Sequence, residues 1–389
     1  MLTYLDHAAT APLRPEAAAA VVAQLGVAGG NSTGSHALAR ASRQVVEEAR
    51  DVVAECLGCR PGEVVFTAGG TEADNLAVAG TIAAAGGVPV CSAIEHHAVL
   101  HPVEALGGRT APVTRDGTVD LDGLAEVLLA SPLPVTLVSV MLVNNEVGTI
   151  QPLLAVADVV ARHAPGAVLH TDAVQAVPWL DAAASAPAQL VSVSAHKLGG
   201  PQGVGALVVR DGTPLRAQLL GGGQERERRS GTHNVAGIAG FAAALAATVA
   251  ERETTVARVG RLRDRLADGL LAAVPGTRET GVRAGKVAGS CHVLFEGIES
   301  ETLLVLLDQH GVCASAASSC ASGALEPSHV LAAMGIARDA AKGSLRLSLG
   351  ATTTEVDVDH ALAVLPDAVA RLRRRDPLVA RLAPLTAPA

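Results

Sequence analysis

Short runs of apolar and β-branched residues recur along the first two thirds of the chain. Six of them have the length of a strand: EVVFT (63–67), GVPVCSA (87–93), TLVSVMLV (136–143), AVLHTDA (167–173), LVSVSA (190–195) and VGALVVR (204–210). Between most of them lie Ala-rich segments with helical spacing, such as TEADNLAVAGTIAAA and LLAVADVVARHA. This alternation predicts an α/β fold with a mostly parallel sheet covered by helices.

The pattern changes after about residue 250. A charged helical segment, ERETTVARVGRLRDRLADGLLAAV, precedes shorter strands near residues 291–295 and 344–349 and a closing helix over about 355–374. A chain of 389 residues is long for one core, so we predict two domains. A large α/β domain would span residues 15–255, and a smaller α+β domain would combine residues 1–14 with residues 256–389.

Composition narrows the class of function. Apolar residues make up 49% of the chain and charged residues 17%, which is typical of a globular protein. Scarce aromatic residues (1%) and a net charge of −8 argue against a direct nucleic-acid binder. The apolar run 234–250 is mainly Ala and Gly, so we expect a buried helix and no membrane span. The start MLTYLDHAAT lacks a basic and apolar leader, which predicts a cytoplasmic protein.

Two strand ends carry groups that suit a ligand, because open α/β sheets bind ligands at the carboxyl ends of their strands. After the first run, two glycines precede Thr71, an arrangement that forms either an anion site at a helix start or an ordinary cap. After the second run come His96, His97 and His101. No second cluster has metal-ligand spacing, so we expect no metal site and favour a histidine ring that stacks on a flat cofactor.

Two further strand ends carry Asp172 and Lys197. The chain has three lysines, and this one stands in SAHKLGGPQG, between a histidine and a Gly-Gly-Pro turn. A carboxylate at a strand end can simply cap a helix. Together, however, a phosphate cradle, a stacking histidine, a carboxylate and a lysine are the groups that pyridoxal 5'-phosphate requires. We therefore predict this cofactor.

At this point the sequence resembles the class-V aminotransferase-like enzymes of PLP fold type I, and within them the cysteine desulfurases of the NifS/IscS type. Matching segments run over nearly the whole chain: YLDHAATAPLRPE, TAGGTEADNLA, AIEHHAVL, VNNEVGTIQP, HTDAVQAV, SAHKLGGPQGVGAL, GGGQERERRSGTHN, CASGALEPSHVLAAMG and SLRLSLG. The resemblance implies a large, mostly parallel sheet of the seven-stranded type and a small domain that carries a catalytic cysteine.

The resemblance also implies roles for cofactor-binding residues by matching position. The cofactor phosphate would be held by Gly70, Thr71, Ser194 and His196. His96 would stack on the ring, Asp172 would pair with the pyridine nitrogen, and Gln175 would bond the phenolic oxygen. Lys197 would form the Schiff base with the cofactor aldehyde.

Substrate and subunit contacts follow from the same comparison. Asn145 would lie near the ring and the substrate, and Arg346 would bind the substrate carboxylate with its planar guanidinium. Thr232, in RSGT, would reach the cofactor phosphate of the neighbouring subunit. The resemblance therefore implies a homodimer with a shared active site.

Cys320 distinguishes a desulfurase from a general aminotransferase, because only the desulfurase needs a thiol nucleophile. The resemblance implies that L-cysteine becomes L-alanine, that Cys320 takes the sulfur as a persulfide, and that a protein acceptor then receives it. Lys197 would remove the α-proton, and His96 would serve proton transfer. The flanking SAASSCASG is small and polar, as expected of a surface loop.

Other readings stay open. One alternative is a selenocysteine lyase or another PLP-dependent C–S lyase of the same fold, and another is a non-catalytic sulfur-transfer module. Cys56 and Cys59 form a CxxC that could be redox-active, and Cys313 could relay a persulfide. Ala317 stands where the resembling enzymes carry glycine before the cysteine, which predicts a stiffer hinge.

Overall fold

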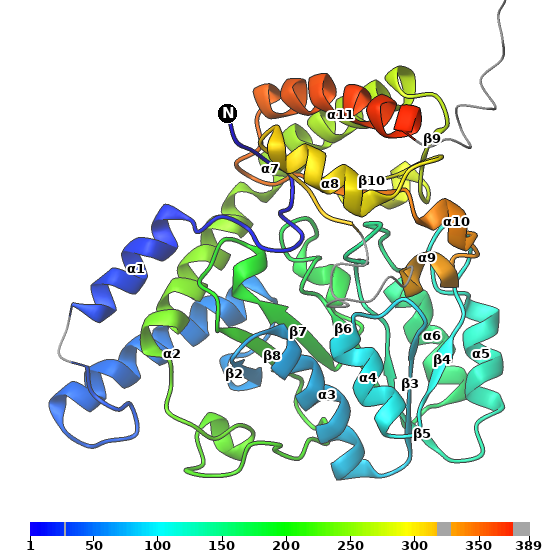
Figure 1. Cartoon of the computed structure of the whole chain (residues 1–389). Coiled ribbons are helices and arrows are strands. Elements are labelled where there is room, and N and C mark those ends of the chain that lie inside the picture. Colours follow the sequence, from blue (N-terminus) through cyan, green and yellow to red (C-terminus); the bar gives the residue numbers. More distant parts are fainter. Residues whose placement is uncertain (27–28, 317–327, 376–389) are drawn as a thin grey trace, which may run out of the picture. The chain divides into compact units, whose positions relative to one another are not determined.

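The computed structural model describes residues 1–26, 29–316 and 328–375 (Figure 1). Contacts between residues divide the chain into two units. The large unit comprises Ala8–Asn145 and Thr149–Thr254, and the small unit comprises Met1–His7, Glu146–Gly148 and the described residues from Thr255 onward.

A seven-stranded sheet forms the centre of the large unit, in the order β2-β8-β7-β6-β5-β3-β4. Its strands are β2 (Val64–Thr67), β3 (Val88–Ser92), β4 (Arg109–Ala111), β5 (Val135–Ser139), β6 (Val168–Asp172), β7 (Leu190–Ser194) and β8 (Gly205–Val209). Only β8 runs antiparallel to its neighbours β2 and β7. The predicted mostly parallel sheet is therefore confirmed, and six of its strands fall on the six predicted runs.

Helices connect these strands and cover the sheet. The helices of the large unit are α1 (Pro15–Leu25), α2 (Ala37–Cys56), α3 (Gly70–Ala85), α4 (His97–Ala105), α5 (Leu121–Leu129) and α6 (Leu153–His163). Short 3₁₀ helices are η1 (Pro61–Glu63), η2 (Ala182–Ser185), η3 (Ala195–Lys197) and η4 (Glu225–Glu227). In Figure 1, α3 and α4 lie side by side, and α3 packs against β5, β6, β7 and β8.

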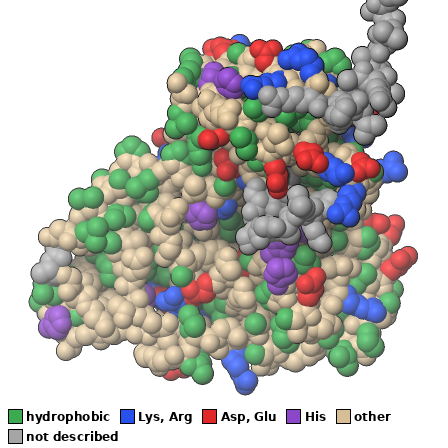
Figure 2. All heavy atoms as spheres, in the orientation of Figure 1, with side chains coloured by type: hydrophobic (Ala, Val, Ile, Leu, Met, Phe, Trp, Pro, Cys, Tyr) green, Lys and Arg blue, Asp and Glu red, His purple; other side chains and the backbone are tan. Residues whose placement is uncertain are grey.

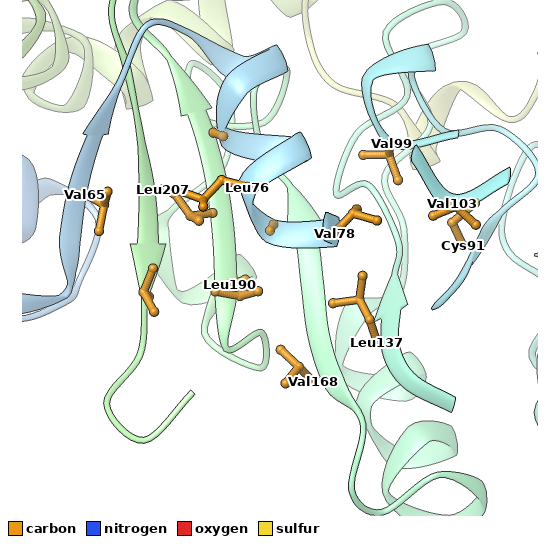
Figure 3. Packing of buried hydrophobic residues seen from close by; sticks show 13 residues of the cluster. Val65, Leu76, Val78, Cys91, Val99, Val103, Leu137, Val168, Leu190 and Leu207 are labelled. Carbon is orange, nitrogen blue, oxygen red and sulfur yellow. The ribbon is translucent and has the colours of Figure 1, made fainter. Parts of the chain in front are cut away.

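The core beneath α3 and α4 is made of small and branched side chains (Figure 3). Leu76 and Val78 of α3 and Val99 of α4 lie over sheet residues such as Leu137 and Leu207. A chain with 1% aromatic residues must fill its core in this way, and each fully buried Leu or Val contributes about 1.5–3 kcal/mol. The tight packing fixes the N-terminus of α3 against the ends of the strands.

Helix α7 (Val235–Ala273) is a single helix of 39 residues. It joins the apolar run and the charged segment that the sequence pattern separated, because neither Pro nor Gly interrupts the chain where the composition changes. Among the described residues it is the one helix long and apolar enough to cross a membrane, judged by length and composition alone. The apolar window is 44% buried inside the protein.

The small unit contains two sheets. Its strands are β1 (Thr3–Tyr4), β9 (Thr277–Glu279), β10 (Ser290–Phe295), β11 (Val312–Cys313) and β12 (Ser344–Ser348). An antiparallel sheet has the order β12-β10-β9, and β1 pairs in parallel with β11. The helical elements are η5 (Arg283–Gly285), α8 (Ser300–Gln309), α9 (His329–Ala333), α10 (Arg338–Ala341) and α11 (Glu355–Arg375).

Charged side chains are spread over the face shown in Figure 2. Lys and Arg side chains are scattered among acidic and hydrophobic ones on this face. Among the described residues visible on this face, the basic side chains do not form a continuous surface.

Candidate active site

Lys197 ends the short helix η3, directly after β7. Its Nζ donates hydrogen bonds to the carbonyl oxygens of Ala8 (2.6 Å) and Ala9 (2.8 Å). Gln175 Nε2 donates to the same Ala8 oxygen (2.8 Å). The N-terminal segment of the large unit therefore holds both side chains through one carbonyl group.

Asp172 is the last residue of β6 and is buried. Its Oδ1 accepts a hydrogen bond from the N–H of Val174 (2.8 Å). Burial raises the pKa of this carboxyl to about 6, while the Val174 hydrogen bond and the positive charge of Lys197 act in the opposite direction. A buried carboxylate of this kind is strongly stabilised by a cation placed against it.

A cavity of about 690 Å³ lies at the N-terminus of α3. Its lining consists of Ala68, Gly69, Gly70, Thr71, Glu72, Asn75, Ser194, His196, Gln202 and Gly203. The structure thus brings the four predicted phosphate ligands to one cavity. The first backbone N–H groups of a helix have no partner within the helix, which makes its N-terminus an anion site.

Glycine at two positions keeps this cavity open. Gly69 has φ +151°, which residues with a Cβ rarely adopt. A Cβ on Gly70 would lie 2.9 Å from Val174 Cγ2 and 3.5 Å from Ser194 Cβ. The two glycines of AGGT therefore let the helix begin close to the ends of β6 and β7.

Two predicted histidines have different surroundings. His96 precedes α4, and its Nδ1 accepts the N–H of Ala98 (3.1 Å), so the neutral ring carries its proton on Nε2. His196 Nδ1 lies 3.2 Å from Thr10 Oγ1. Burial and the charge of Lys197 lower the pKa of His196 to about 4. His196 is therefore neutral at pH 7 and can contribute a hydrogen bond, not a charge, to an anion.

Other predicted residues are not among the described residues that line this cavity. Arg346, on β12 of the small unit, is buried, and its Nη2 donates to Asp6 Oδ1 (2.8 Å). Asn145 is half-buried in the loop after β5, and Thr232 is exposed in the segment before α7. Cys320 lies outside the described residues, as does the Ala317 position.

The residues present fit the phosphate, the ring nitrogen and the aldehyde of pyridoxal 5'-phosphate. The glycine-lined cavity suits the phosphate, the buried Asp172 carboxylate suits a protonated ring nitrogen, and the Lys197 amine suits the aldehyde. Within the described ranges, no three His, Cys, Asp or Glu side chains form a group that could hold a metal ion.

Sequence reasoning missed several groups around this site. The carbonyls of Ala8 and Ala9, which hold Lys197, give no signal in a pattern of side chains. Gln202 and Asn75 line the cavity although no role was predicted for them. Gln202 does stand in the quoted turn SAHKLGGPQG, so a Gly-rich turn after a strand was the available signal.

Comparison with known proteins identifies the family of the chain. Residues 3–361 match the family Aminotransferase class-V. The chain is 46% identical over 388 residues to a protein of Mycobacterium tuberculosis named IscS-like cysteine desulfurase, with 96% of this chain and 98% of the relative covered. It is 40% identical to a Methanosarcina thermophila protein named cysteine desulfurase IscS, with 96% and 94% covered.

A solved structure described as a NifS-like protein superposes with a TM-score of 0.88 at 33% identity, covering 96% of this chain and 100% of the other. The sheet order and this likeness confirm the predicted PLP fold type I. The chain therefore belongs to the class-V aminotransferase family and, within it, to the cysteine desulfurases of the IscS/NifS type.

Proposed function

We propose that the chain converts L-cysteine to L-alanine with pyridoxal 5'-phosphate as cofactor, and that Cys320 receives the sulfur as a persulfide. The observation that carries this proposal is the position of Lys197 directly after β7, where its charge lowers the pKa of the buried Asp172, in the same unit as an anion cavity. The named activity of the relatives supports the substrate.

The cofactor would be held by the residues that line this end of the sheet. Its phosphate would bind Gly70, Thr71, Ser194 and His196. Asp172 would keep the ring nitrogen protonated, and Gln175 would bond the phenolic oxygen. When bound, the cofactor supplies an electron sink for the charge left at the substrate Cα.

Proton movement falls to two side chains. Lys197 Nζ would take the proton from the substrate Cα, for which it must first lose its own proton and release the carbonyls of Ala8 and Ala9. His96 would donate from Nε2, because its Nδ1 is engaged by the N–H of Ala98. Each residue thus has one defined atom for its part of the transfer.

Sulfur transfer is balanced without an added oxidant or reductant. The Cys320 thiolate would attack the Sγ atom of the substrate, so that an S–S bond forms and the Cβ–S bond breaks with its electron pair staying on carbon. A proton then completes the methyl group of alanine. An acceptor thiol would remove the outer sulfur of the persulfide by exchange.

The proposal includes the substrate anchor, the assembly and the compartment. Arg346 would bind the substrate carboxylate together with Asn145. Thr232 is exposed, and so are the apolar side chains of Val22, Leu25 and Leu220 of the same unit, which a homodimer would bury. Five cysteines are described and all are free thiols, which supports a cytoplasmic location.

Replacing Lys197 tests the cofactor assignment. The Lys197→Ala variant should bind the cofactor without the covalent link, and alanine formation should fall by at least about a thousandfold because the base is gone. Absorbance of the purified protein and alanine release measure the two effects. Turnover near the wild-type rate would remove Lys197 from the mechanism.

Replacing Cys320 tests the desulfurase assignment. Cys320→Ala should still bind the cofactor and L-cysteine. Its absorbance should change on addition of cysteine as the wild type's does, but it should yield no protein-bound persulfide. Cys313→Ala is the matched control, because Cys313 is a half-buried thiol whose pKa is raised by burial and which should be dispensable. Persulfide labelling after cysteine addition decides; a labelled Cys320→Ala protein would contradict the proposal.

A further inference from the structure

An acidic side chain, Glu72, lines the cavity in which we place the cofactor phosphate. Glu72 belongs to the first turn of α3, next to Thr71. Its Oε2 accepts the backbone N–H of Ala68 (2.9 Å), so this carboxylate fixes the turn that leads from β2 into α3. A negative charge beside a phosphate group would nevertheless repel it.

Arg229 lies against Glu72 and supplies the opposite charge. Arg229 Nε donates to Glu72 Oε1 (2.7 Å), and Nη2 donates to Oε2 (3.2 Å). Both side chains are largely buried, with exposed fractions of 20% for Arg229 and 24% for Glu72. The hydrogen bond to Glu72 raises the pKa of Arg229, so the guanidinium carries a positive charge directly against the carboxyl group.

The backbone that carries Arg229 is held in a disfavoured conformation. Glu225, Arg226 and Glu227 have φ values of +50°, +56° and +65°, in the left-handed region that side chains with a Cβ rarely occupy. Such conformations persist only where surrounding contacts impose them.

A buried ion pair imposes this conformation. Glu225 accepts two hydrogen bonds from Arg50 (2.8 Å each), and one each from the N–H of Phe66 (2.8 Å) and from His233 Nε2 (2.6 Å). Arg50 is itself fixed by the carbonyl of Val64 (2.8 Å). The turn is therefore anchored to β2, the strand that leads into the cavity, and Arg229 follows at a fixed place.

We propose that Arg229 is a positioning residue for cofactor binding: by neutralising Glu72, it lets this carboxylate hold the turn of Ala68 without repelling the cofactor phosphate. The inference rests on the proposed function, since the phosphate concerned is that of pyridoxal 5'-phosphate. Glu72 thus shapes the cavity, and Arg229 offsets the repulsion between the Glu72 carboxylate and the phosphate.

Affinities of the full-length apoenzyme for pyridoxal 5'-phosphate and for pyridoxal, which lacks the phosphate, test the proposal. Arg229→Gln should weaken binding of the phosphorylated form about 5- to 20-fold, as expected for one uncompensated charge near a partly screened dianion. Binding of pyridoxal should change by less than about twofold, because the charge acts on the phosphate alone.

Removing the acidic side chain in place of the basic one provides the control. Glu72→Gln keeps an oxygen for Ala68 and leaves Arg229 uncompensated, so it should bind pyridoxal 5'-phosphate at least as tightly as the wild type. The double variant should return to within about threefold of the wild type. Arg229→Lys keeps the positive charge but loses the two-pronged contact with Glu72, so it should weaken binding less than Arg229→Gln does.

Equal weakening for both ligands, or a double variant as weak as Arg229→Gln, would overturn the inference, because either result means a structural or direct role for Arg229. Thermal melts confirm that each variant is folded. If the wild-type apoenzyme binds no pyridoxal 5'-phosphate, the proposed function fails as well; if it binds and Arg229→Gln binds equally well, only the inference fails.

Discussion

Three buried acidic residues lie around the ends of the central strands of the large unit. Asp172 closes β6, Asp74 lies on α3, and Glu95 precedes His96. Burial raises the pKa of all three carboxyl groups, and the negative charge of Asp172 raises the pKa of Asp74 and Glu95 further. The positive charge of Lys197 favours the ionised form of Asp172. Asp74 and Glu95 remain protonated beside it, because their pKa values are raised.

Replacing Glu95 should change how stability depends on pH. Burial raises the pKa of Glu95 to about 8, whereas the unfolded chain has an ordinary carboxyl. Between about pH 4.5 and 8 the folded state binds one more proton, so the free energy of unfolding falls by about 1.4 kcal/mol per pH unit as pH rises. Glu95→Gln keeps an oxygen for the N–H of Met141 and removes this contribution.

The melting temperature of Glu95→Gln relative to the wild type should therefore rise steadily from pH 4.5 to pH 8. Glu104→Gln, on the exposed side of α4, is the matched control and should show no such trend. A constant difference between Glu95→Gln and the wild type over this range would contradict the assignment of a protonated Glu95.

At the scale of single elements, the strands that the sequence pattern predicts are the ones with a long buried run of residues. Five of the six predicted runs are strands that pair on both sides in a covered sheet, and the sixth, β2, forms one edge of that sheet. The run 136–143 is longer than β5 (Val135–Ser139), because residues 140–143 are buried without being a strand. The two- and three-residue strands β1, β4 and β9 were not predicted, since so few residues carry no detectable period.

The sequence pattern also does not predict contacts made by backbone groups or between residues that are distant in sequence. Lys197, Asp172 and the glycine turn could be predicted because each stands at a strand end. The pairing of Glu72 with Arg229 spans 157 positions and leaves no local trace in either segment. Sequence position therefore predicts the reacting groups better than the groups that support them.

The start of α3 provides a test at this scale. Gly70→Val should weaken cofactor binding at least about tenfold, because its side chain would overlap Val174, whose N–H holds Asp172. Gly62→Ala is the control, since no atom lies within 4 Å of a Cβ at that position. Cofactor titration of the two apoenzymes measures the effect, and equal affinities would show that the cavity tolerates a larger residue there.

At the scale of the whole molecule, the predicted site residues are divided between the two units. The described residues of the large unit hold Lys197, Asp172 and the anion cavity, and the small unit holds Arg346. Thr232, in the motif RSGT, is exposed on the large unit and is not among the described residues that line the cavity. A second subunit would give this residue a partner, which makes the dimer testable by complementation.

Two inactive variants should restore activity when their subunits are exchanged. Lys197→Ala lacks the base, and Thr232→Asp places a carboxylate where the neighbour's phosphate is proposed to bind. In a mixed dimer, the site that keeps Lys197 receives the intact Thr232 from the other chain. Random exchange makes half of the dimers mixed with one good site in each, so activity should recover to about a quarter of the wild-type level.

The control replaces the Lys197→Ala partner by the double variant Lys197→Ala/Thr232→Asp, which should restore nothing because no site then has both residues. Alanine release before and after exchange at low protein concentration gives the measurement. No recovery with the single variant, after exchange is shown by mass labelling, would mean that each subunit completes its site with its own Thr232. Recovery with the double variant would mean that Thr232→Asp does not block a site in either subunit. Because the two variants differ from this control in one residue only, the result depends on where Thr232 acts and not on the stability of either chain.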